Sequence, residues 1–312
     1  MSVAFDNILN FRDVGKTIND YLGRKVLREG VFYRSARPDD ASPIDRKRLK
    51  DELGIRTVVD LRSKTELLKQ AQKRQAAATA LPALSNTALA EQQQQQQQQH
   101  PLQIPGLRYR TVKVTGRRFE IFLLRQLAWW SFFKFLLLFL LGYRTQAIAI
   151  LGREVMQPRG LVGLGIAMLD ESGAEIAEAL HTLTTPPSSS SPSSLPLLIH
   201  CTQGKDRTGL VVLLALAALG VPPDAISHDY LLSRAGGLAA KGEDKGEAEE
   251  RLLLEQDIRE IGLTPEWADV PDDFVEKILG HLHGKYGGVE NYLRGVGFGN
   301  DERERLVEVL GA

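Results

Sequence analysis

The sequence predicts a single α/β domain spanning residues 1–312, with a central mixed sheet, helices on both of its sides and a helical C-terminal portion. Short apolar segments typical of buried strands alternate with segments that have helical periodicity, and only helical segments follow residue 220. The 312 residues are also 43% apolar, which is enough to bury a full core, although length alone would allow two small domains.

The first half of the chain carries three strand candidates and one helix. Val31–Ser35 is a short strand candidate, and Thr57–Leu61 is apolar enough to be a buried strand. Tyr109–Val114 alternates between apolar and polar residues, which is typical of a strand with one solvated face. Between the first two strands, Asp45–Glu52 has the pattern of a helix.

The second half places one further strand between helices. Gly173–Leu183 has its apolar residues on one side and predicts a helix, and Leu195–Ile199 predicts a buried strand. A loop around Cys201 follows at once, and then the strongly apolar helix Leu210–Leu219. Later helices are expected at Asp224–Arg234, Glu247–Ile261, Pro271–His283, Val289–Arg294 and Asp301–Leu310.

Two stretches have the composition of surface insertions. Residues 70–105 are rich in alanine and contain the unbroken glutamine tract Gln92–Gln99. Residues 184–196 are dense in serine and proline, which is typical of a flexible loop. Neither stretch has an apolar face to bury, so we expect tolerated insertions with no role in the site.

Residues 118–150 form an apolar helical segment with three alternative placements. Its central part, Ile121–Leu141, holds two of the three tryptophans, but Arg125 and Lys134 interrupt the roughly 20 apolar residues that a spanning helix needs. At about 100° per residue these two charges would lie on opposite sides of one helix, which leaves no clean polar face. We expect a helix packed into the core or a lid over a functional site, with a peripheral membrane contact through 121–141 as the third alternative.

Charge and cysteine content narrow the function classes. Lys plus Arg number 39, as do Asp plus Glu, so no global charge directs the protein to nucleic acid. The single cysteine permits no intrachain disulfide, and the N-terminal residues lack a signal-peptide pattern, so we expect an intracellular, cytoplasmic protein. The histidines show no metal-ligand pattern, so neither a metal nor a cofactor is predicted.

The segment from His200 to Gly209 predicts an anion site. A strand, a tight glycine-containing loop and a helix let the loop's N–H groups converge on one phosphate, at the positive end of the helix. The residues that would surround this phosphate are Thr202, Gln203, Gly204, Lys205, Asp206 and Arg207. The guanidinium of Arg207 can hold two phosphate oxygens, and the positive surroundings favour a nucleophilic thiolate at Cys201. A lone cysteine is more often a small buried apolar residue, but this combination of strand, His-Cys, glycines and Lys-Asp-Arg-Thr does not arise by chance.

At these residues the sequence resembles the protein tyrosine phosphatase superfamily, whose signature is His-Cys, five residues, Arg and Ser or Thr. The match Gly204–Gly209 narrows the resemblance to the bacterial and fungal branch of tyrosine, or dual-specificity-like, phosphatases. Further matches to this branch are Asn10–Gly15, Tyr33–Ser35, Val59–Ser63 with Glu66, and Tyr286–Leu293. The resemblance covers most of the chain apart from the two insertions, and it implies a tyrosine-phosphatase-like fold.

The resemblance also implies site roles. Cys201 would be the nucleophile that forms a cysteinyl-phosphate, Arg207 the phosphate clamp, and Thr208 the residue that stabilises the leaving thiolate. The proton donor is open, because the chain contains no Trp-Pro-Asp. The branch implies Asp60, which could instead pair with Arg62 or cap the next helix; Asp206 and Asp170 are the further candidates. His200 is expected to orient the loop, and Arg12–Asp13 and Arg62–Glu66 are expected to be structural pairs.

The resemblance implies phosphotyrosine protein as substrate, with phosphoserine, phosphothreonine or phosphoinositide in addition. Lys205 suits a more highly charged substrate such as a phosphoinositide, although a solvated lysine that tunes the local field fits equally. A basic cluster adds support for a membrane-facing substrate, although charges on an exposed strand would look the same. The cluster consists of Arg108, Arg110, Lys113, Arg117 and Arg118.

Two other function classes fit parts of the pattern. A rhodanese-like sulfurtransferase also uses a cysteine loop, but His200 and the Thr208-Gly209 continuation argue against it. A phosphate-binding pseudophosphatase without turnover is the other alternative, and the intact Cys201, Arg207 and Thr208 count against it.

Overall fold

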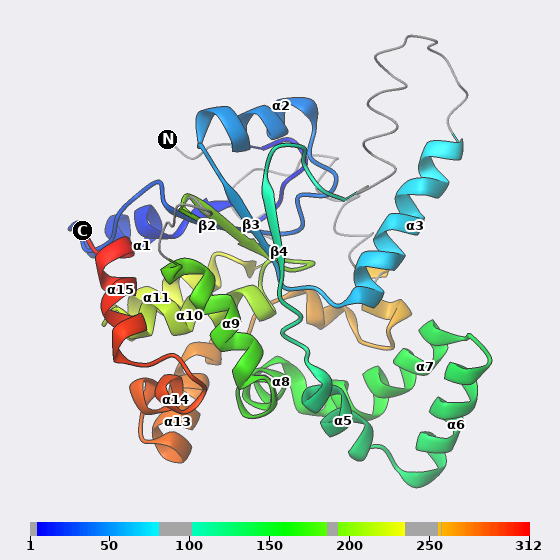
Figure 1. The fold of residues 1–312 in the computed structure, drawn as a ribbon. Helices are drawn as coiled ribbons and strands as arrows, with labels where there is room; N and C mark the ends of the chain where they lie inside the picture. Colours follow the sequence, from blue (N-terminus) through cyan, green and yellow to red (C-terminus); the bar gives the residue numbers. More distant parts are fainter. Residues whose placement is uncertain (1–4, 81–101, 186–192, 235–254, 257) are drawn as a thin grey trace.

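The computed structural model describes residues 5–80, 102–185, 193–234, 255–256 and 258–312. Within these ranges, five strands form one mixed sheet in the order β1-β2-β5-β3-β4 (Figure 1). The strands are β1 (Arg12–Asp13), β2 (Phe32–Ser35), β3 (Thr57–Asp60), β4 (Arg108–Thr111) and β5 (Leu197–His200). Only β1 runs antiparallel to its neighbour, so the predicted α/β class with a mixed sheet is confirmed.

The three central strands end together. β5 lies between β2 and β3, and His200 is in register with Ser35 on one side and Asp60 on the other. In an open parallel sheet, the loops beyond the carboxyl ends of the strands form the binding crevice. The Cys201 loop therefore starts at the edge of the sheet where a functional site is expected.

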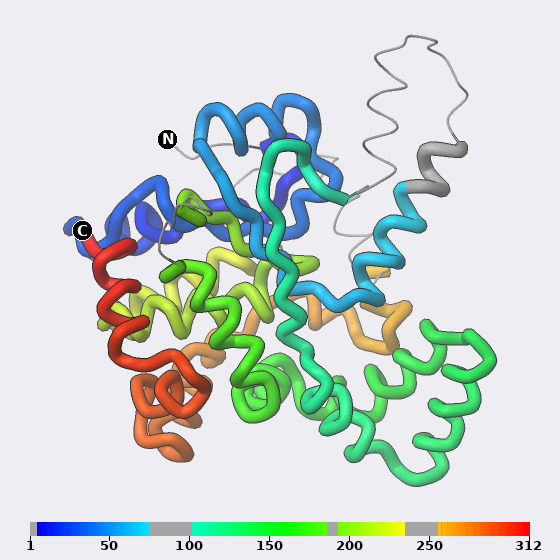
Figure 2. Tube along the Cα trace, viewed as in Figure 1, coloured from blue at the N-terminus to red at the C-terminus, as the bar shows by residue number. Residues whose placement is uncertain are grey.

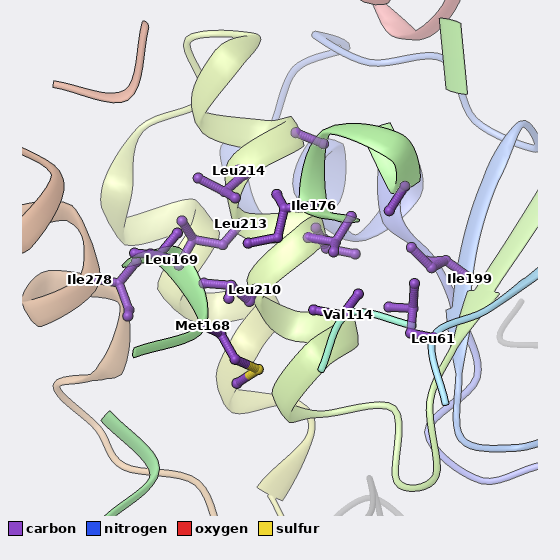
Figure 3. Packing of buried hydrophobic residues seen from close by; sticks show 14 of the residues in the cluster. Leu61, Val114, Met168, Leu169, Ile176, Ile199, Leu210, Leu213, Leu214 and Ile278 are labelled. Atoms are coloured by element: carbon purple, nitrogen blue, oxygen red, sulfur yellow. The ribbon is translucent and has the colours of Figure 1, made fainter. Parts of the chain in front are cut away.

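Side chains of the central strands alternate between two apolar clusters. Leu197 and Ile199 of β5 face the larger cluster, whereas Leu198 between them faces the smaller one. Figure 3 shows part of the larger cluster, in which Ile199 and Leu61 lie near side chains of the helices below the sheet. The smaller cluster is covered by α2 (Pro43–Lys47) and the π-helical turn η1 (Arg48–Glu52) (Figure 1).

The remaining helices that the structure describes are α1 (Val14–Leu22), α3 (Lys64–Ala80), α5 (Arg117–Arg125), α6 (Trp129–Leu140), α7 (Arg144–Leu151), η2 (Gly152–Met156), α8 (Gln157–Glu171), α9 (Gly173–Thr184), α10 (Asp206–Ala218), α11 (Pro223–Leu231), η4 (Pro265–Ala268), α13 (Phe274–Tyr286), α14 (Val289–Gly295) and α15 (Asn300–Leu310). Most of them pack against the larger cluster or form the C-terminal portion, whereas α3 and the pair α6 and α7 lie at the periphery (Figures 1 and 2).

Several helix boundaries differ from those that the sequence predicts. The helix expected at Asp45–Glu52 starts at Pro43, because Ser42 and Asp45 form a reciprocal capping box. The helix after the Cys201 loop starts at Asp206, four residues earlier than expected, since its first turn is part of the loop sequence. The glutamine tract and most of the helix expected at Glu247–Ile261 lie outside the described residues, whereas α3 continues into the first predicted insertion.

The apolar segment 118–150 differs most from expectation. It forms α5, α6 and α7 in place of one helix, so Arg125 and Lys134 belong to different helices. α5 buries Phe119 and Leu123, but α6 has no buried residue, and core placement is therefore wrong for α6. None of the described helices combines the length and the apolar character needed to cross a membrane.

Candidate active site

The Cys201 loop connects the end of β5 to the start of α10, and its thiol is buried with 2% of the residue exposed. The carbonyl oxygens of three successive loop residues, Thr202, Gln203 and Gly204, are bound from outside the loop. The donors are the Arg37 backbone N–H at 3.2 Å, the Asn10 side chain at 3.1 Å and the Arg34 guanidinium at 2.8 Å. Because a planar trans peptide directs its C=O and N–H oppositely, the N–H groups that follow these carbonyls are directed inward. The loop can therefore receive an anion.

Gly204 is required by the shape of the loop. Its φ is +71°, and a Cβ at this position would lie 2.2 Å from the carbonyl oxygen of Ser35. The Gly204 N–H donates to the Cys201 sulfur at 3.2 Å. A glycine at this position thus allows the loop to pack on β2 while its N–H donates a hydrogen bond to the sulfur.

A buried ion pair supports the loop from behind. Arg34 is completely buried, and its guanidinium binds both the Gly204 carbonyl and the Asp229 carboxylate on α11. Arg12 donates to the same carboxylate at 2.7 Å, and this neighbouring positive charge lowers the pKa of Asp229 although burial opposes the shift. The expected Arg12–Asp13 pair is wrong, because Asp13 caps α1 and accepts from the Gly30 N–H at 2.6 Å. Sequence reasoning missed Asp229, which lies 217 positions from Arg12.

Glu66 holds the guanidinium of Arg207. Its two carboxylate oxygens each accept from one Arg207 nitrogen at 2.7 Å, and one of them also accepts from the Thr202 hydroxyl at 2.7 Å. The same carboxylate closes a capping box with Ser63 at the start of α3. Burial disfavours the charged form of Glu66, but Arg207 outweighs it and lowers the pKa of Glu66. The expected Arg62–Glu66 pair is therefore wrong.

Asp60 lies at the end of β3 and is bound to Arg62 on both oxygens, at 2.7–3.1 Å. The other side of the Arg62 guanidinium binds Asp39. Burial favours the protonated form of Asp60, but the Arg62 guanidinium outweighs it and lowers the pKa of Asp60. Asp60 is thus a buried carboxylate with its acceptor sites occupied, which matches the alternative of pairing with Arg62.

His200 is completely buried, and burial lowers its pKa more than Asp60 raises it. Its Nδ1 lies 3.0 Å from the Cys201 carbonyl oxygen, so Nδ1 carries the proton and donates it there. The Nε2 is 3.7 Å from Asp60, too far for a hydrogen bond. The neutral imidazole therefore holds the first peptide of the loop.

The two other candidate proton donors, Asp206 and Asp170, lie in different parts of the structure. Asp206 is the first residue of α10, its side chain is 30% exposed, and it accepts from the Lys205 ammonium at 2.8 Å. Lys205 itself is buried, with only 2% of the residue exposed. Asp170 is elsewhere, on α8, where it binds His281 and Tyr286 of α13.

Thr208 is completely buried, and its hydroxyl has no hydrogen-bond partner among the described residues. Where the structure describes the chain, no group of three or more His, Cys, Asp or Glu side chains could hold a metal ion. The loop thus joins a buried thiol, inward N–H groups and a positioned guanidinium. These groups suit in-line attack on a phosphate ester.

Comparison with known proteins agrees with this geometry. The family model described as the tyrosine phosphatase family matches residues 3–120 and 156–311. A tyrosine-protein phosphatase of Nostoc commune is 33% identical over 124 residues, which cover 37% of this chain and 39% of that protein. A putative tyrosine-protein phosphatase of Cupriavidus necator is 26% identical over 292 residues, covering 94% of this chain and 82% of that protein. A triple specificity protein phosphatase of Mycobacterium tuberculosis is 29% identical over 227 residues, covering 72% of this chain and 66% of that protein.

Proposed function

The chain belongs to the tyrosine phosphatase family, and we propose that it hydrolyses phosphotyrosine through a cysteinyl-phosphate intermediate on Cys201. The observation that carries this proposal is the loop around the thiol. The Gly204 N–H of this loop donates to the Cys201 sulfur, and Glu66 binds the guanidinium of Arg207 through two hydrogen bonds. No other cysteine exists in the chain that could act as nucleophile.

In the first step, the Cys201 thiolate attacks phosphorus, the S–P bond forms and the bond from phosphorus to the tyrosine oxygen breaks. The N–H groups of the loop and the Arg207 guanidinium bind the three equatorial oxygens of the phosphoryl group, over which negative charge is spread in the transition state. Glu66 orients Arg207 through two hydrogen bonds, so the guanidinium is preorganised before the substrate arrives.

The leaving oxygen needs a proton, and we propose that Asp206 supplies it. Asp206 is partly exposed at the start of α10 and accepts from Lys205 on one oxygen, whereas the Asp60 carboxylate is buried and both its oxygens are bound to Arg62. A proton donor must reach the leaving group within hydrogen-bond distance, and its carboxyl must carry a proton. Asp60 is therefore better suited to hold Arg62 and face His200, and Asp170 lies on another element.

In the second step, water attacks phosphorus, the S–P bond breaks and inorganic phosphate is released. The carboxylate that gave its proton can take one from this water. The returning thiolate would be stabilised by the Gly204 N–H, which already donates to the sulfur, and by the unpartnered hydroxyl of Thr208.

The substrate range includes phosphotyrosine and, as a wider proposal, phosphoserine, phosphothreonine and phosphoinositide. The mycobacterial relative is named a triple specificity phosphatase, which supports a range beyond phosphotyrosine. Two of the basic residues expected to favour phosphoinositides are partly neutralised by carboxylates. Lys113 pairs with Glu120 at 2.5 Å, and Arg118 with Glu171 at 3.4 Å.

The test compares the wild type with Cys201→Ser for phosphate release from a phosphotyrosine peptide, a phosphoserine peptide and a soluble phosphoinositide. We expect wild-type turnover of the phosphotyrosine peptide and a loss of at least about 10³-fold in the variant, because serine is not ionised at neutral pH. Peptide binding by both proteins without phosphate release from either would instead identify a phosphate-binding module without turnover.

A further inference from the structure

Helix α6 exposes apolar side chains over most of its surface. Five of its residues and the one that follows it illustrate this, with 48–75% exposure at Trp129, Trp130, Phe133, Leu137, Leu140 and Leu141. Burial of large aromatic and aliphatic side chains is the main stabilising contribution in folding, so a solvated face of this size indicates an interaction surface. Figure 2 shows α6 and α7 as a hairpin at the periphery of the molecule.

The exposed side chains of α6 span a wide arc. Ser131, Phe135 and Leu138 are the three half-buried residues of α6, and at about 100° per residue they form one narrow stripe. Phe135 packs against the larger core cluster, and the Ser131 hydroxyl donates to Glu154 at 2.8 Å. With Leu141 included, the apolar positions outside this stripe cover about 200° of the circumference. A partner helix or protein groove contacts a narrower stripe, whereas a bilayer can surround such an arc.

The sequence around α6 is basic. Residues 121–153 contain Arg125, Lys134, Arg144 and Arg153, and no Asp or Glu. Among the described residues, no carboxylate forms an ion pair with Arg125, Lys134 or Arg144. Arg144 instead lies over the Phe139 ring, 5.6 Å from its centroid. In a chain with equal numbers of basic and acidic residues, this local excess complements an anionic surface.

Lys134 has a position suited to an interface. On the helix it lies at the edge of the apolar arc, next to the stripe that faces the protein. A long cationic side chain at such an edge can extend to the headgroups while its carbon chain stays among apolar groups. Arg125 also lines a groove between α5 and α6, whose walls include Ile121, Trp129 and Phe133.

The apolar hairpin is separate from the family fold. The family model matches up to residue 120 and again from residue 156, so α6 and α7 fall in the unmatched interval. α6 has 12 residues and a length of about 18 Å, too short to cross the roughly 30 Å hydrocarbon layer of a bilayer. Such a helix can lie in the plane of the interface.

We propose that α6, with its own Lys134 and the flanking cations Arg125 and Arg144, binds the surface of an anionic lipid bilayer and holds the domain there. The exposed apolar arc enters the boundary between headgroups and acyl chains, and the cations pair with anionic headgroups. This inference rests on α6 and its surroundings, and it stands independently of the chemistry at Cys201.

The test measures binding of the purified full chain to vesicles of phosphatidylcholine alone and of phosphatidylcholine with phosphatidylserine, by flotation. We expect binding to the anionic vesicles and weakening by salt. The double variant Trp130→Glu with Leu140→Glu should weaken binding by at least about tenfold. Replacing Arg125 and Lys134 by glutamine should weaken it by roughly fivefold per cation for anionic vesicles only. Val307→Glu is the matched control and should leave binding within about twofold, since Val307 is 49% exposed on α15, at the opposite side of Figure 1.

Tryptophan fluorescence supplies a second readout. Trp129 and Trp130 are exposed, whereas Trp267 is 8% exposed, so quenching by brominated lipid acyl chains reports mainly on α6. Hydrolysis of a small soluble substrate should be unchanged in the Trp130→Glu and Leu140→Glu variant, which separates this proposal from the active site. Failure of the wild type to bind either vesicle would overturn the proposal, as would full binding by the double variant. A dimer in light scattering that the double variant abolishes, without vesicle binding, would assign α6 to contact between two copies.

Discussion

Replacing Glu66 by glutamine should disable the positioning of Arg207 while preserving the fold. Glutamine is nearly isosteric and keeps one side-chain oxygen, which can accept either from the Ser63 N–H, as Oε2 does, or from the Thr202 hydroxyl, as Oε1 does. It loses the charge, and its amide nitrogen cannot accept from Arg207. One of the two 2.7 Å bonds that hold the guanidinium is therefore removed, and the other becomes a bond to a neutral acceptor.

The magnitude follows from this geometry. A hydrogen bond to a charged group contributes about 1.5–3 kcal/mol. Because the Glu66 side chain is 34% exposed, solvent screening reduces the loss, and we expect the free energy of unfolding to fall by about 1–2 kcal/mol. In a chain of this size that corresponds to a decrease in Tm of roughly 2–4 °C. The loss of Arg207 preorganisation should lower kcat by about 10–100-fold.

The assay combines steady-state hydrolysis of p-nitrophenyl phosphate with thermal unfolding. Glu120→Gln is the matched control, because it removes an exposed glutamate that pairs with Lys113, and it should change stability by less than about 0.5 kcal/mol. Since the pKa of Glu66 is lowered in the folded state, its stabilisation is present above the unfolded value near 4.5 and is lost as pH falls toward the folded value. The stability difference between wild type and variant should therefore shrink below about pH 4.5. A Glu66→Gln enzyme with kcat within twofold of wild type would refute the positioning role.

Three further predictions follow from the loop. Asp206→Asn should slow hydrolysis of alkyl phosphates by about 10²–10³-fold but that of p-nitrophenyl phosphate far less, because a good leaving group needs little protonation. The same pattern in Asp60→Asn, without it in Asp206→Asn, would identify Asp60 as the proton donor. Gly204→Ala should destabilise the fold by at least about 2 kcal/mol in denaturant unfolding and abolish phosphate binding, since its Cβ would meet the Ser35 carbonyl at 2.2 Å; unchanged phosphate affinity would contradict this. Burial lowers the pKa of His200, so the unfolded chain binds the proton at higher pH than the folded one, and the free energy of unfolding should fall as pH drops below about 6.5. His200→Asn should reduce this dependence of stability on pH, and the same dependence in both proteins would disprove the neutral, buried state of His200.

The local part of the fold was predictable because its signals are local. The apolar segments at Thr57–Asp60 and Leu197–His200 predicted the two central strands to within one or two residues, and the glycine-containing sequence after Cys201 predicted the loop. Boundaries shifted where side-chain capping decided them, as at Ser42 before α2.

The ion pairs of the site were not predictable by proximity in sequence. Glu66 reaches Arg207 across 141 positions, and Arg12 reaches Asp229 across 217. Pairing neighbours such as Arg62 with Glu66 ignores that successive residues after a strand point in different directions. The Ser63–Glu66 capping-box spacing did signal a helix start at the sheet edge, where Glu66 could face the loop.

The apolar segment shows the limit of composition as evidence. Its aromatic and leucine content left core, lid and peripheral membrane placement open, and α6 buries no residue. Apolar composition favours transfer out of water, but it does not say whether protein or lipid provides the apolar surroundings.

The central claim is that phosphate is transferred to Cys201, and acid-quench trapping tests it most directly. Wild-type enzyme mixed with excess p-nitrophenyl phosphate is quenched within the first turnover, digested, and analysed by mass spectrometry for the peptide that contains Cys201. We expect one phosphoryl group on the Cys201 sulfur, with a matching burst of nitrophenol, and neither in Cys201→Ser. Phosphate release by Cys201→Ser at the wild-type rate, or phosphoryl transfer to another residue, would contradict the mechanism.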